Sequence, residues 1–429
     1  MRHRVRAGLA LAVLGTALLA SVWRLGVHDA ADVATGGDRP QPSSAKLVAQ
    51  GAYLARAGNC GLCHTQRGGS AYAGGRAMET PFGTVFSSNL TPDPATGLGS
   101  WTSGHFWRAL HHGRSRDGRL LYPAFPYTSM TQVTRADSDA LFAYLQSLAP
   151  VAQTNTAHRL RWPYNTQAAL ALWRALYFKP GSFEPVAGQS APWNRGAYLV
   201  RGLGHCNACH TARNALGAPD TRADLAGGPI PMQNWYAPSL LSPSEAGVAE
   251  WDEKQVVALL QTGLAPRGAV TGPMAEVVLH STQFLSGADL VAMAVFLKSL
   301  PSVAPAAGRG AAAAAPSGGS PQGAKLYEKH CAQCHGDQGA GVPGAYPALA
   351  GNRAVLMGNA SNLVQIVLHG GFAPATAGNP RPYGMPPYMV LLGDSEIAQV
   401  LTHIRSAWGN RAGEVTELDV TRNRAGATR

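Results

Sequence analysis

Apolar residues recur at helical spacing in three stretches of the chain, and such spacing predicts a helix in each of them. The three stretches are Ala140–Leu148, Leu290–Leu300 and Glu396–Trp408. An acidic residue precedes or opens each stretch, as helix N-termini favour. These acidic residues are Asp137 or Asp139, Asp289 and Asp394. We therefore expect three helices, each of which closes a unit of similar build.

The three units are copies of one repeat. The segment GAYLAR at 51–56 returns as GAYLVR at 196–201 and, more diverged, as GAKLYE at 323–328. A Cys-x-x-Cys-His motif follows shortly after each copy. Repetition of this kind indicates a duplicated structural unit. The pattern predicts a mainly α fold of three tandem domains, each with an opening helix, the cysteine motif, a loop-rich middle and a closing helix.

The segments between the copies differ in composition. Residues 301–322 are mostly Ala, Pro, Gly and Ser, which is typical of a flexible linker. Residues 151–190 carry several aromatic side chains and a helix-like stretch at 167–177, so we expect a packed connector that pins the first two domains together. The polar tail at 411–429 is expected to lie on the surface or to be disordered. The domains between them are unit 1 (46–150), unit 2 (191–300) and unit 3 (323–410).

The amino terminus has the pattern of a targeting segment. Arg2, Arg4 and Arg6 precede an uncharged stretch from Ala7 to Trp23. A basic start followed by an apolar core is typical of an export signal, and the stretch is also near the shortest length that spans a bilayer. Residues 1–30 are therefore either a cleaved signal or a retained membrane anchor. Both alternatives predict that the rest of the chain lies outside the cytoplasm.

Composition and charge exclude some classes of protein. Only 14% of the residues are charged, whereas Gly and Pro number 50 and 30, which argues against coiled coils and for tightly turned backbone. A formal net charge of +11 would suit nucleic acid, but part of it belongs to the amino-terminal segment. Basic and aromatic residues are not interleaved in a patch. We therefore expect no nucleic-acid partner.

All 6 cysteines of the chain lie in the three Cys-x-x-Cys-His motifs. Two thiols at this spacing can add to the two vinyl groups of one haem, and the next histidine is then the proximal ligand of its iron. A zinc site of four cysteines would leave one pair over, and thiol–disulfide exchange would need a βαβ context. The motifs therefore predict three covalently bound haem c groups. The predicted haem-binding residues are Cys60, Cys63, His64, Cys206, Cys209, His210, Cys331, Cys334 and His335.

The sixth iron ligand distinguishes electron transfer from catalysis, because methionine closes the iron whereas an open iron binds small molecules. One methionine in a Pro-containing loop precedes each closing helix, and we predict these as the sixth ligands: Met130, Met274 and Met385. Met78, Met232 and Met389 are the competing methionines. Six histidines are further alternatives, although a structural or surface role is the simpler interpretation: His105, His111, His112, His205, His280 and His369.

Several longer motifs resemble the trihaem cytochrome c subunits of bacterial membrane-bound dehydrogenases that act on alcohols, gluconate, fructose or aldehydes. They are NLTPDP at 89–94, GLGSW at 97–101, LYPAFPY at 121–127, GPMAEVV at 272–278 and WGN at 408–410. The resemblance covers nearly the whole chain, from about Lys46 to Asn410. One departure is Phe125, where the family often has methionine; Met130 is the nearest methionine to it.

The resemblance implies three class I cytochrome c domains and a separate catalytic subunit with a flavin, pyrroloquinoline quinone or molybdenum cofactor. It also implies a location in the periplasm, associated with the inner membrane, where electrons would leave to ubiquinone or a terminal oxidase. We therefore expect an electron-transfer subunit that is not catalytic alone and has no catalytic residues of its own. Two alternatives stay open: an independent multihaem electron carrier, and a haem peroxidase or reductase with one open iron.

Overall fold

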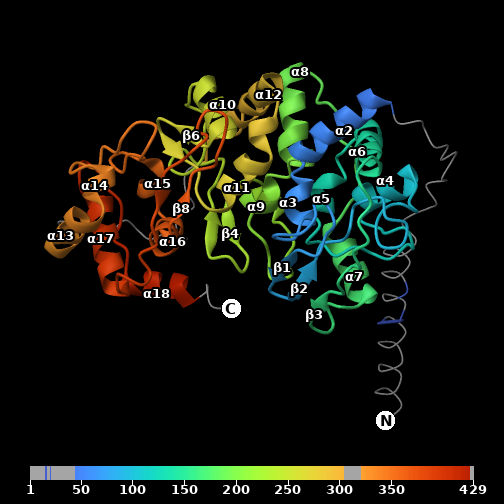
Figure 1. Cartoon of the computed structure of the whole chain (residues 1–429), viewed down its shortest axis with the longest axis horizontal. Coiled ribbons are helices and arrows are strands. Elements are labelled where there is room, and N and C mark those ends of the chain that lie inside the picture. Colours follow the sequence, from blue (N-terminus) through green and yellow to red (C-terminus); the bar gives the residue numbers. More distant parts are fainter. Residues whose placement is uncertain (1–14, 17–19, 21–43, 304–319, 426–429) are drawn as a thin grey trace, which may run out of the picture.

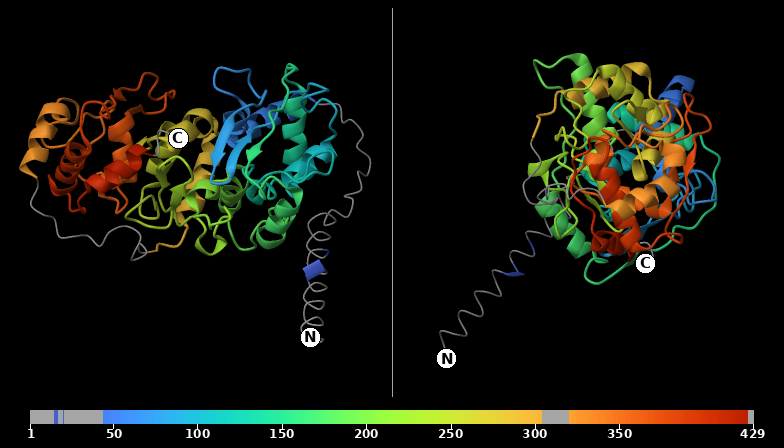
Figure 2. Two further views of the ribbon diagram at one scale, coloured as in Figure 1. Left: turned by 90° about the horizontal axis from the view of Figure 1, so that it is seen from below. Right: turned by 90° about the vertical axis from the view of Figure 1, so that its left-hand side faces the viewer.

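The computed structural model describes residues 44–303 and 320–425, together with residues 15, 16 and 20. The expected targeting segment and most of the expected linker lie outside these residues. The described part of the chain is mainly helical, and its three units lie in a row with unit 2 in the middle (Figure 1). A view from below shows the same order (Figure 2). Within the described residues, no helix has the length and apolarity needed to cross a bilayer.

An opening helix crosses a closing helix in every unit. The pairs are α2 (Ala45–Ala57) with α6 (Arg135–Gln146), α8 (Ala191–Ala197) with α12 (Gly287–Lys298), and α13 (Pro321–His330) with α17 (Asp394–Ser406). The first glycine of each repeat lies at the crossing. A Cβ atom on Gly51, Gly196 or Gly323 would lie 1.9, 2.0 or 2.2 Å from a backbone oxygen of the closing helix. The repeat therefore begins with glycine because only glycine lets the two helices approach this closely.

The closing helices begin earlier than their apolar residues indicate. Helix α6 begins at Arg135 because the Thr134 hydroxyl caps it by accepting from the Asp137 N–H at 3.2 Å. Helix α12 begins at Gly287 because Ser286 caps it in the same way. The predicted acidic residues Asp137 and Asp289 thus lie in the first turns of these helices, where a negative charge is favourable.

Unit 2 contains a π-helix, η1 (Tyr198–Leu203), which continues helix α8. Gly196 is separated from Cys206 by one residue more than Gly51 is from Cys60. The wider π-helical turn accommodates an inserted residue of this kind. Because of it, the cysteine motifs of both units can follow the crossing helices in similar positions.

The middle of each unit consists of short elements joined by loops, as the glycine and proline content predicts. Unit 1 contains α3 (Cys60–His64), β1 (Ala77–Thr80), β2 (Gly83–Phe86), α4 (Ser103–His112) and α5 (Tyr127–Met130). Unit 2 contains α9 (Asn207–His210), η2 (Thr221–Ala223), β4 (Gly228–Ile230), β5 (Trp235–Ala237), α10 (Glu253–Thr262), β6 (Leu264–Ala265), β7 (Gly268–Ala269), α11 (Pro273–His280) and η3 (Thr282–Phe284). Unit 3 contains α14 (Ala332–His335), α15 (Arg353–Leu356), α16 (Ser361–His369), β8 (Gly371–Phe372) and β9 (Gly384–Met385).

The connector at 151–190 lies against unit 1 and reaches unit 2. Its strand β3 (Arg159–Leu160) pairs with β2, so that β1, β2 and β3 form an antiparallel sheet in that order. Its helix α7 (Gln167–Tyr177) buries Leu170 and Ala171 against Leu120 of unit 1. The Trp173 indole N–H donates to the backbone oxygen of Leu216 in unit 2 at 2.9 Å.

Units 1 and 2 share one apolar core. It contains Leu54 and Leu145 of unit 1 together with Leu203 and Phe296 of unit 2, each at most 2% exposed. Unit 3 has a separate core that includes Leu368, Ile397 and Leu401. Burial of such side chains is the main source of folding free energy. The first two units therefore fold around a common interior, whereas the third encloses its own.

The carboxyl-terminal segment forms a helix, α18 (Glu417–Ala425), which packs beside α16 and α17. Val415 and Val420 are buried in the core of unit 3. The Arg424 guanidinium forms an ion pair with Asp394 at the start of α17, at 2.5 Å. Much of the segment expected to be a surface tail is thus an ordered part of unit 3.

Candidate haem centres

The histidine of each cysteine motif is held in the same way. Its Nδ1 lies within hydrogen-bonding distance of a backbone carbonyl oxygen: 2.7 Å from Ser88 for His64, 2.7 Å from Pro238 for His210 and 2.9 Å from Pro347 for His335. A carbonyl only accepts, so Nδ1 carries the proton and Nε2 keeps the lone pair that a metal ion binds. Burial lowers the pKa of all three imidazoles, which favours this neutral form.

The first cysteine of each motif is a buried thiol with a raised pKa. Burial raises the pKa of Cys60 and Cys206 to about 12 and that of Cys331 to about 11, and the second cysteine of the same motif adds to each shift. Zinc binding and thiol exchange both need thiolates. In the described ranges, no group of three or more His, Cys, Asp or Glu side chains is arranged to hold a metal ion. Two thiols and one oriented imidazole in each motif supply the two thioether bonds and the proximal iron ligand that a haem c group needs.

A cavity of about 1540 Å³ lies where the three units meet. Cys331, Cys334 and His335 of unit 3 line it, and so does Met385. The cavity is large and largely bordered by apolar residues, which suits a flat hydrophobic ring such as haem. The motif, the oriented imidazole and the cavity of unit 3 thus fit one haem group.

The same cavity is bordered by Cys63 of unit 1 and Cys209 of unit 2. Burial raises the pKa of Cys63, and Cys209 acts in the same direction. The second cysteines of these two motifs therefore face a common space, which the unit 3 motif also borders.

The structure places the predicted sixth ligands differently in the three units. Met385 lies in β9 and lines the cavity with His335, whereas its competitor Met389 does not line it. Met130 ends α5 and is buried in the shared core, while Met78 lies in β1 and borders the cavity. Met274 is the second residue of α11 and packs against the shared core.

The assignment of methionines to the three irons stays a prediction. Met232, the competitor in unit 2, is 50% exposed. Met274 is the better packed of the two, because it contacts the shared core.

Three of the alternative histidines have structural contacts. The ring of His105 accepts from the Thr102 N–H at 3.2 Å and completes the cap of α4. His111 stacks on Trp107 with ring centroids 4.4 Å apart. His205 Nε2 lies 3.3 Å from the backbone oxygen of Gly58 across the junction of units 1 and 2. These contacts favour the structural interpretation of these side chains.

Two arginines that sequence reasoning did not select support the motifs of units 1 and 2. Arg76 donates to the backbone oxygen of Leu62, and Arg213 to that of Ala208, each at 2.8 Å. Both acceptors occupy the same position, directly before the second cysteine. Arg76 also lies 3.8 Å from Glu276, across the junction of the two units. The two arginines stand at different distances from their motifs along the chain, so no repeat signal marks them.

Helical units built around Cys-x-x-Cys-His turns, with each histidine presenting Nε2, define a c-type cytochrome. The Cytochrome c family model matches residues 48–149 and 320–408. The cytochrome c subunit of alcohol dehydrogenase (quinone) from Gluconacetobacter polyoxogenes is 41% identical over 401 residues, which are 90% of this chain and 85% of that protein.

Two further relatives are similar over most of their length. The gluconate 2-dehydrogenase cytochrome c subunit from Pantoea cypripedii is 39% identical, over 87% of this chain and 88% of its own. The fructose dehydrogenase cytochrome subunit from Gluconobacter japonicus is 34% identical, over 90% and 85%. The chain belongs to this family of dehydrogenase cytochrome c subunits, which confirms the resemblance found in the sequence.

Proposed function

We propose that the chain is a trihaem cytochrome c that relays electrons from the catalytic subunit of a dehydrogenase to ubiquinone or a terminal oxidase. The observation that carries the proposal is the common geometry of the three motif histidines, each with Nδ1 on a carbonyl oxygen and Nε2 left for iron. The proposal places one haem in each unit, so that the units are three class I cytochrome c domains in tandem.

The side chains of the motifs would hold and orient the three groups. A bound haem supplies reversible one-electron chemistry at its iron. The six cysteines would attach the rings as thioethers, and His64, His210 and His335 would bind the irons. Met130, Met274 and Met385 would be the second protein ligands of the irons, and a thioether ligand favours a raised reduction potential.

The family supports a dehydrogenase as the partner. The relatives are named as cytochrome subunits of alcohol, gluconate and fructose dehydrogenases. The catalytic subunit would carry a flavin, pyrroloquinoline quinone or molybdenum cofactor, and the cytochrome would not be catalytic alone. The export-type amino terminus supports a place in the periplasm at the inner membrane.

The number of haems per chain and the spin state of their irons test the proposal of a trihaem electron carrier. We expect the intact mass of the purified protein to show three haem c groups per chain, with no free thiol. We expect the spectrum of all three to be low-spin and insensitive to cyanide. Fewer than three haems would contradict the proposal, whereas a high-spin component that shifts with cyanide would favour the peroxidase or reductase alternative.

Met385→Ala tests the sixth ligand of unit 3, with Met389→Ala as the matched control. Loss of a thioether ligand opens the iron and lowers its potential. We therefore expect Met385→Ala to convert about a third of the absorbance to a high-spin form. Met389→Ala should leave the spectrum and the potentials unchanged. The reverse result would assign the ligand to Met389.

Purification under mild conditions tests the partner. We expect a dehydrogenase subunit to co-purify from native membranes in a fixed ratio and to reduce the cytochrome when its substrate is added. Consistent absence of such a subunit would favour the independent electron carrier.

A further inference from the structure

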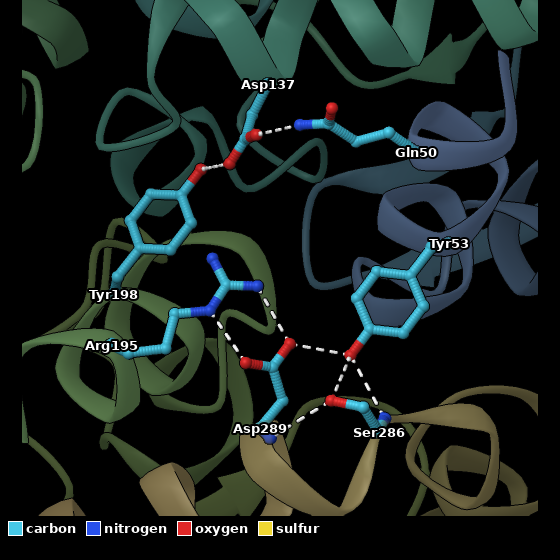
Figure 3. A network of polar contacts seen from close by, with 7 residues as sticks. All are labelled: Gln50, Tyr53, Asp137, Arg195, Tyr198, Ser286 and Asp289. Carbon is cyan, nitrogen blue, oxygen red and sulfur yellow. Dashed lines mark hydrogen bonds and ion pairs between the residues drawn. The ribbon is translucent and has the colours of Figure 1, made fainter. Parts of the chain in front are cut away.

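Two tyrosine–aspartate hydrogen bonds cross the junction of units 1 and 2 in opposite directions. Tyr53 of unit 1 donates to Asp289 of unit 2 at 2.6 Å, and Tyr198 of unit 2 donates to Asp137 of unit 1 at 2.6 Å (Figure 3). Each tyrosine follows the crossing glycine of its own unit at the same spacing, and each aspartate is the third residue of a closing helix. We refer to these two reciprocal contacts as the tyrosine latches.

Both latches have the same construction around the hydroxyl group. The Tyr53 oxygen also accepts from the N–H of Ser286 at 3.1 Å, and the Tyr198 oxygen accepts from the N–H of Thr134 at 3.4 Å. Ser286 and Thr134 are the N-cap residues of the closing helices. Each hydroxyl is therefore held by one acceptor and one donor at the start of a helix in the other unit, which fixes its position in two directions.

The third partner of the aspartate differs between the latches. Asp289 accepts two hydrogen bonds from Arg195, both at 2.8 Å, whereas Asp137 accepts one from Gln50 at 3.1 Å. Burial alone would raise the pKa of Asp289, but the hydrogen bonds from Arg195 and Tyr53 hold it below its usual value. Burial and Asp289 together raise the pKa of Tyr53. The carboxylate therefore stays ionised and the hydroxyl stays protonated at neutral pH.

Each latch is joined directly to a haem-binding motif. Tyr53 lies about two helical turns before Cys60 on α2, and Tyr198 lies at a similar distance before Cys206. Since Cys63 and Cys209 border one cavity, a rotation of either unit at the junction would change the separation of the two motifs. Such a rotation would also stretch the two tyrosine–aspartate hydrogen bonds, which join the units in opposite directions.

Among the residues that the structure describes, unit 3 shows no counterpart of the latch. Lys325 occupies the position of Tyr53 and Tyr198 in the repeat. Glu396 occupies the position of the aspartates, and its carboxylate accepts from the N–H of Gly393 in its own helix at 2.9 Å. The contact thus belongs to the pair of units that share a core.

We infer that Tyr53 and Tyr198 are positioning residues that fix the relative orientation of units 1 and 2 and thereby the separation of their two haem-binding motifs. The inference rests on the proposed function only in that these motifs carry haem. The geometry of the junction itself is independent of the electron donor and acceptor.

Distance measurements on the haem-loaded full-length protein test the inference. Cysteines introduced by Ser70→Cys and Lys254→Cys, both at exposed positions, provide one gadolinium label in each unit, because haem attachment consumes the native cysteines. Pulsed electron resonance then gives the distribution of label distances with the haems reduced. The variants are Tyr53→Phe, Tyr198→Phe and both together.

Tyr236→Phe is the matched control. It removes a tyrosine–carboxylate hydrogen bond, to Glu245 at 3.0 Å, within unit 2 alone. Amide exchange of the N-cap residues Ser286 and Thr134 provides a second measurement, since each N–H donates to a latch hydroxyl.

We expect the wild type and Tyr236→Phe to give one narrow distance distribution, each single latch variant a broader one and the double variant the broadest. Exchange of the two N-cap amides should rise about 2- to 10-fold in the double variant, as expected for the loss of one hydrogen bond to a neutral hydroxyl group. A double variant that carries three haems and keeps the narrow distribution would overturn the inference while leaving the proposed function intact. A wild type without three haems would contradict the proposed function instead.

Discussion

The two junctions between units are built on different principles. Units 1 and 2 share an apolar core and exchange the tyrosine latches. Units 2 and 3 meet through hydrogen bonds: Asn362 donates to and accepts from the backbone of Tyr236, at 2.8 and 2.9 Å, and Arg353 donates to the Gly247 oxygen at 2.7 Å. Arg353 also lies over the ring of Trp251 at 5.1 Å.

The comparison shows that one repeat can serve as half of a fixed pair or as a separate module. Lys325, in place of the latch tyrosine, is one position at which the two kinds of unit differ. A shared core makes two units fold together, whereas a polar junction leaves each unit with its own stability.

The largest effect is expected from a side chain placed where the opening and closing helices of a unit cross. Gly196→Ala and Gly323→Ala each place a Cβ about 2 Å from a backbone oxygen, so the helices must separate. We expect each to lower the free energy of unfolding by about 3 kcal/mol or more. Thermal unfolding followed at the haem absorbance should show that Gly196→Ala destabilises units 1 and 2 together, and Gly323→Ala unit 3 alone.

Gly287→Ala is the control for these variants, because a Cβ there meets no atom within 4 Å. It should leave all transitions within about 0.5 kcal/mol of the wild type. A Gly196→Ala variant that lowers only the transition of unit 2 would contradict the shared core.

Cleavage between units 2 and 3 should separate them. A protease site can be introduced between residues 303 and 320, the segment that joins unit 2 to unit 3 along the chain. The polar contacts of the junction contribute about 1 kcal/mol each, and their sum does not exceed the roughly 4 to 15 kcal/mol that association of free fragments costs. Gel filtration after cleavage should give a fragment with two haems and another with one. Elution of both fragments as one complex would show that the junction is stronger than its contacts indicate.

Smaller effects are expected from single contacts between units 2 and 3. Asn362→Ala removes two hydrogen bonds to Tyr236, which is expected to weaken the junction by about 1 to 3 kcal/mol. The unfolding transitions of the three units should not move, while small-angle scattering should show a larger maximum dimension. An unchanged dimension together with a lower transition of unit 3 would assign Asn362 to the stability of the unit instead.

Acid should weaken the latch of Asp289 slightly. Its pKa lies below the ordinary value because of Arg195 and Tyr53, despite burial, so the unfolded chain takes up the proton first as pH falls. The contribution to stability is complete above the ordinary value of about 3.9 and is lost as pH falls through the lower folded value. The difference in stability between the wild type and Asp289→Asn should therefore shrink only below about pH 4. If the difference in stability between the two proteins did not change with pH, the charge of Asp289 would not contribute to the latch.

The local features of the fold and the site could be predicted from the sequence. The period of the apolar residues predicts the closing helices, and the cysteine motifs predict the three histidines that the structure holds with Nδ1 on a carbonyl oxygen, because both signals involve residues close together in the chain. Helices α6 and α12 begin before their apolar stretches, since the capping hydroxyls of Thr134 and Ser286 extend the helices beyond their apolar residues.

Features that depend on distant parts of the chain could not be predicted in this way. Tyr53 and Asp289 are 236 positions apart, and nothing near either residue marks the pair. Helix α18 was missed because its surface is polar and only Val420 reaches the core from within it. The arginines that support the motifs are found only once the folded chain brings them there.

The reciprocal latches have the symmetry of a twofold homodimer. In such an interface the same residue of each copy contacts the same partner on the other copy, as Tyr53 and Tyr198 do here. The connector ties the two copies into one chain, so their association no longer depends on protein concentration. Units 1 and 2 thus have the arrangement expected of a duplicated gene whose product first paired with itself, while unit 3 lacks the residues for such pairing.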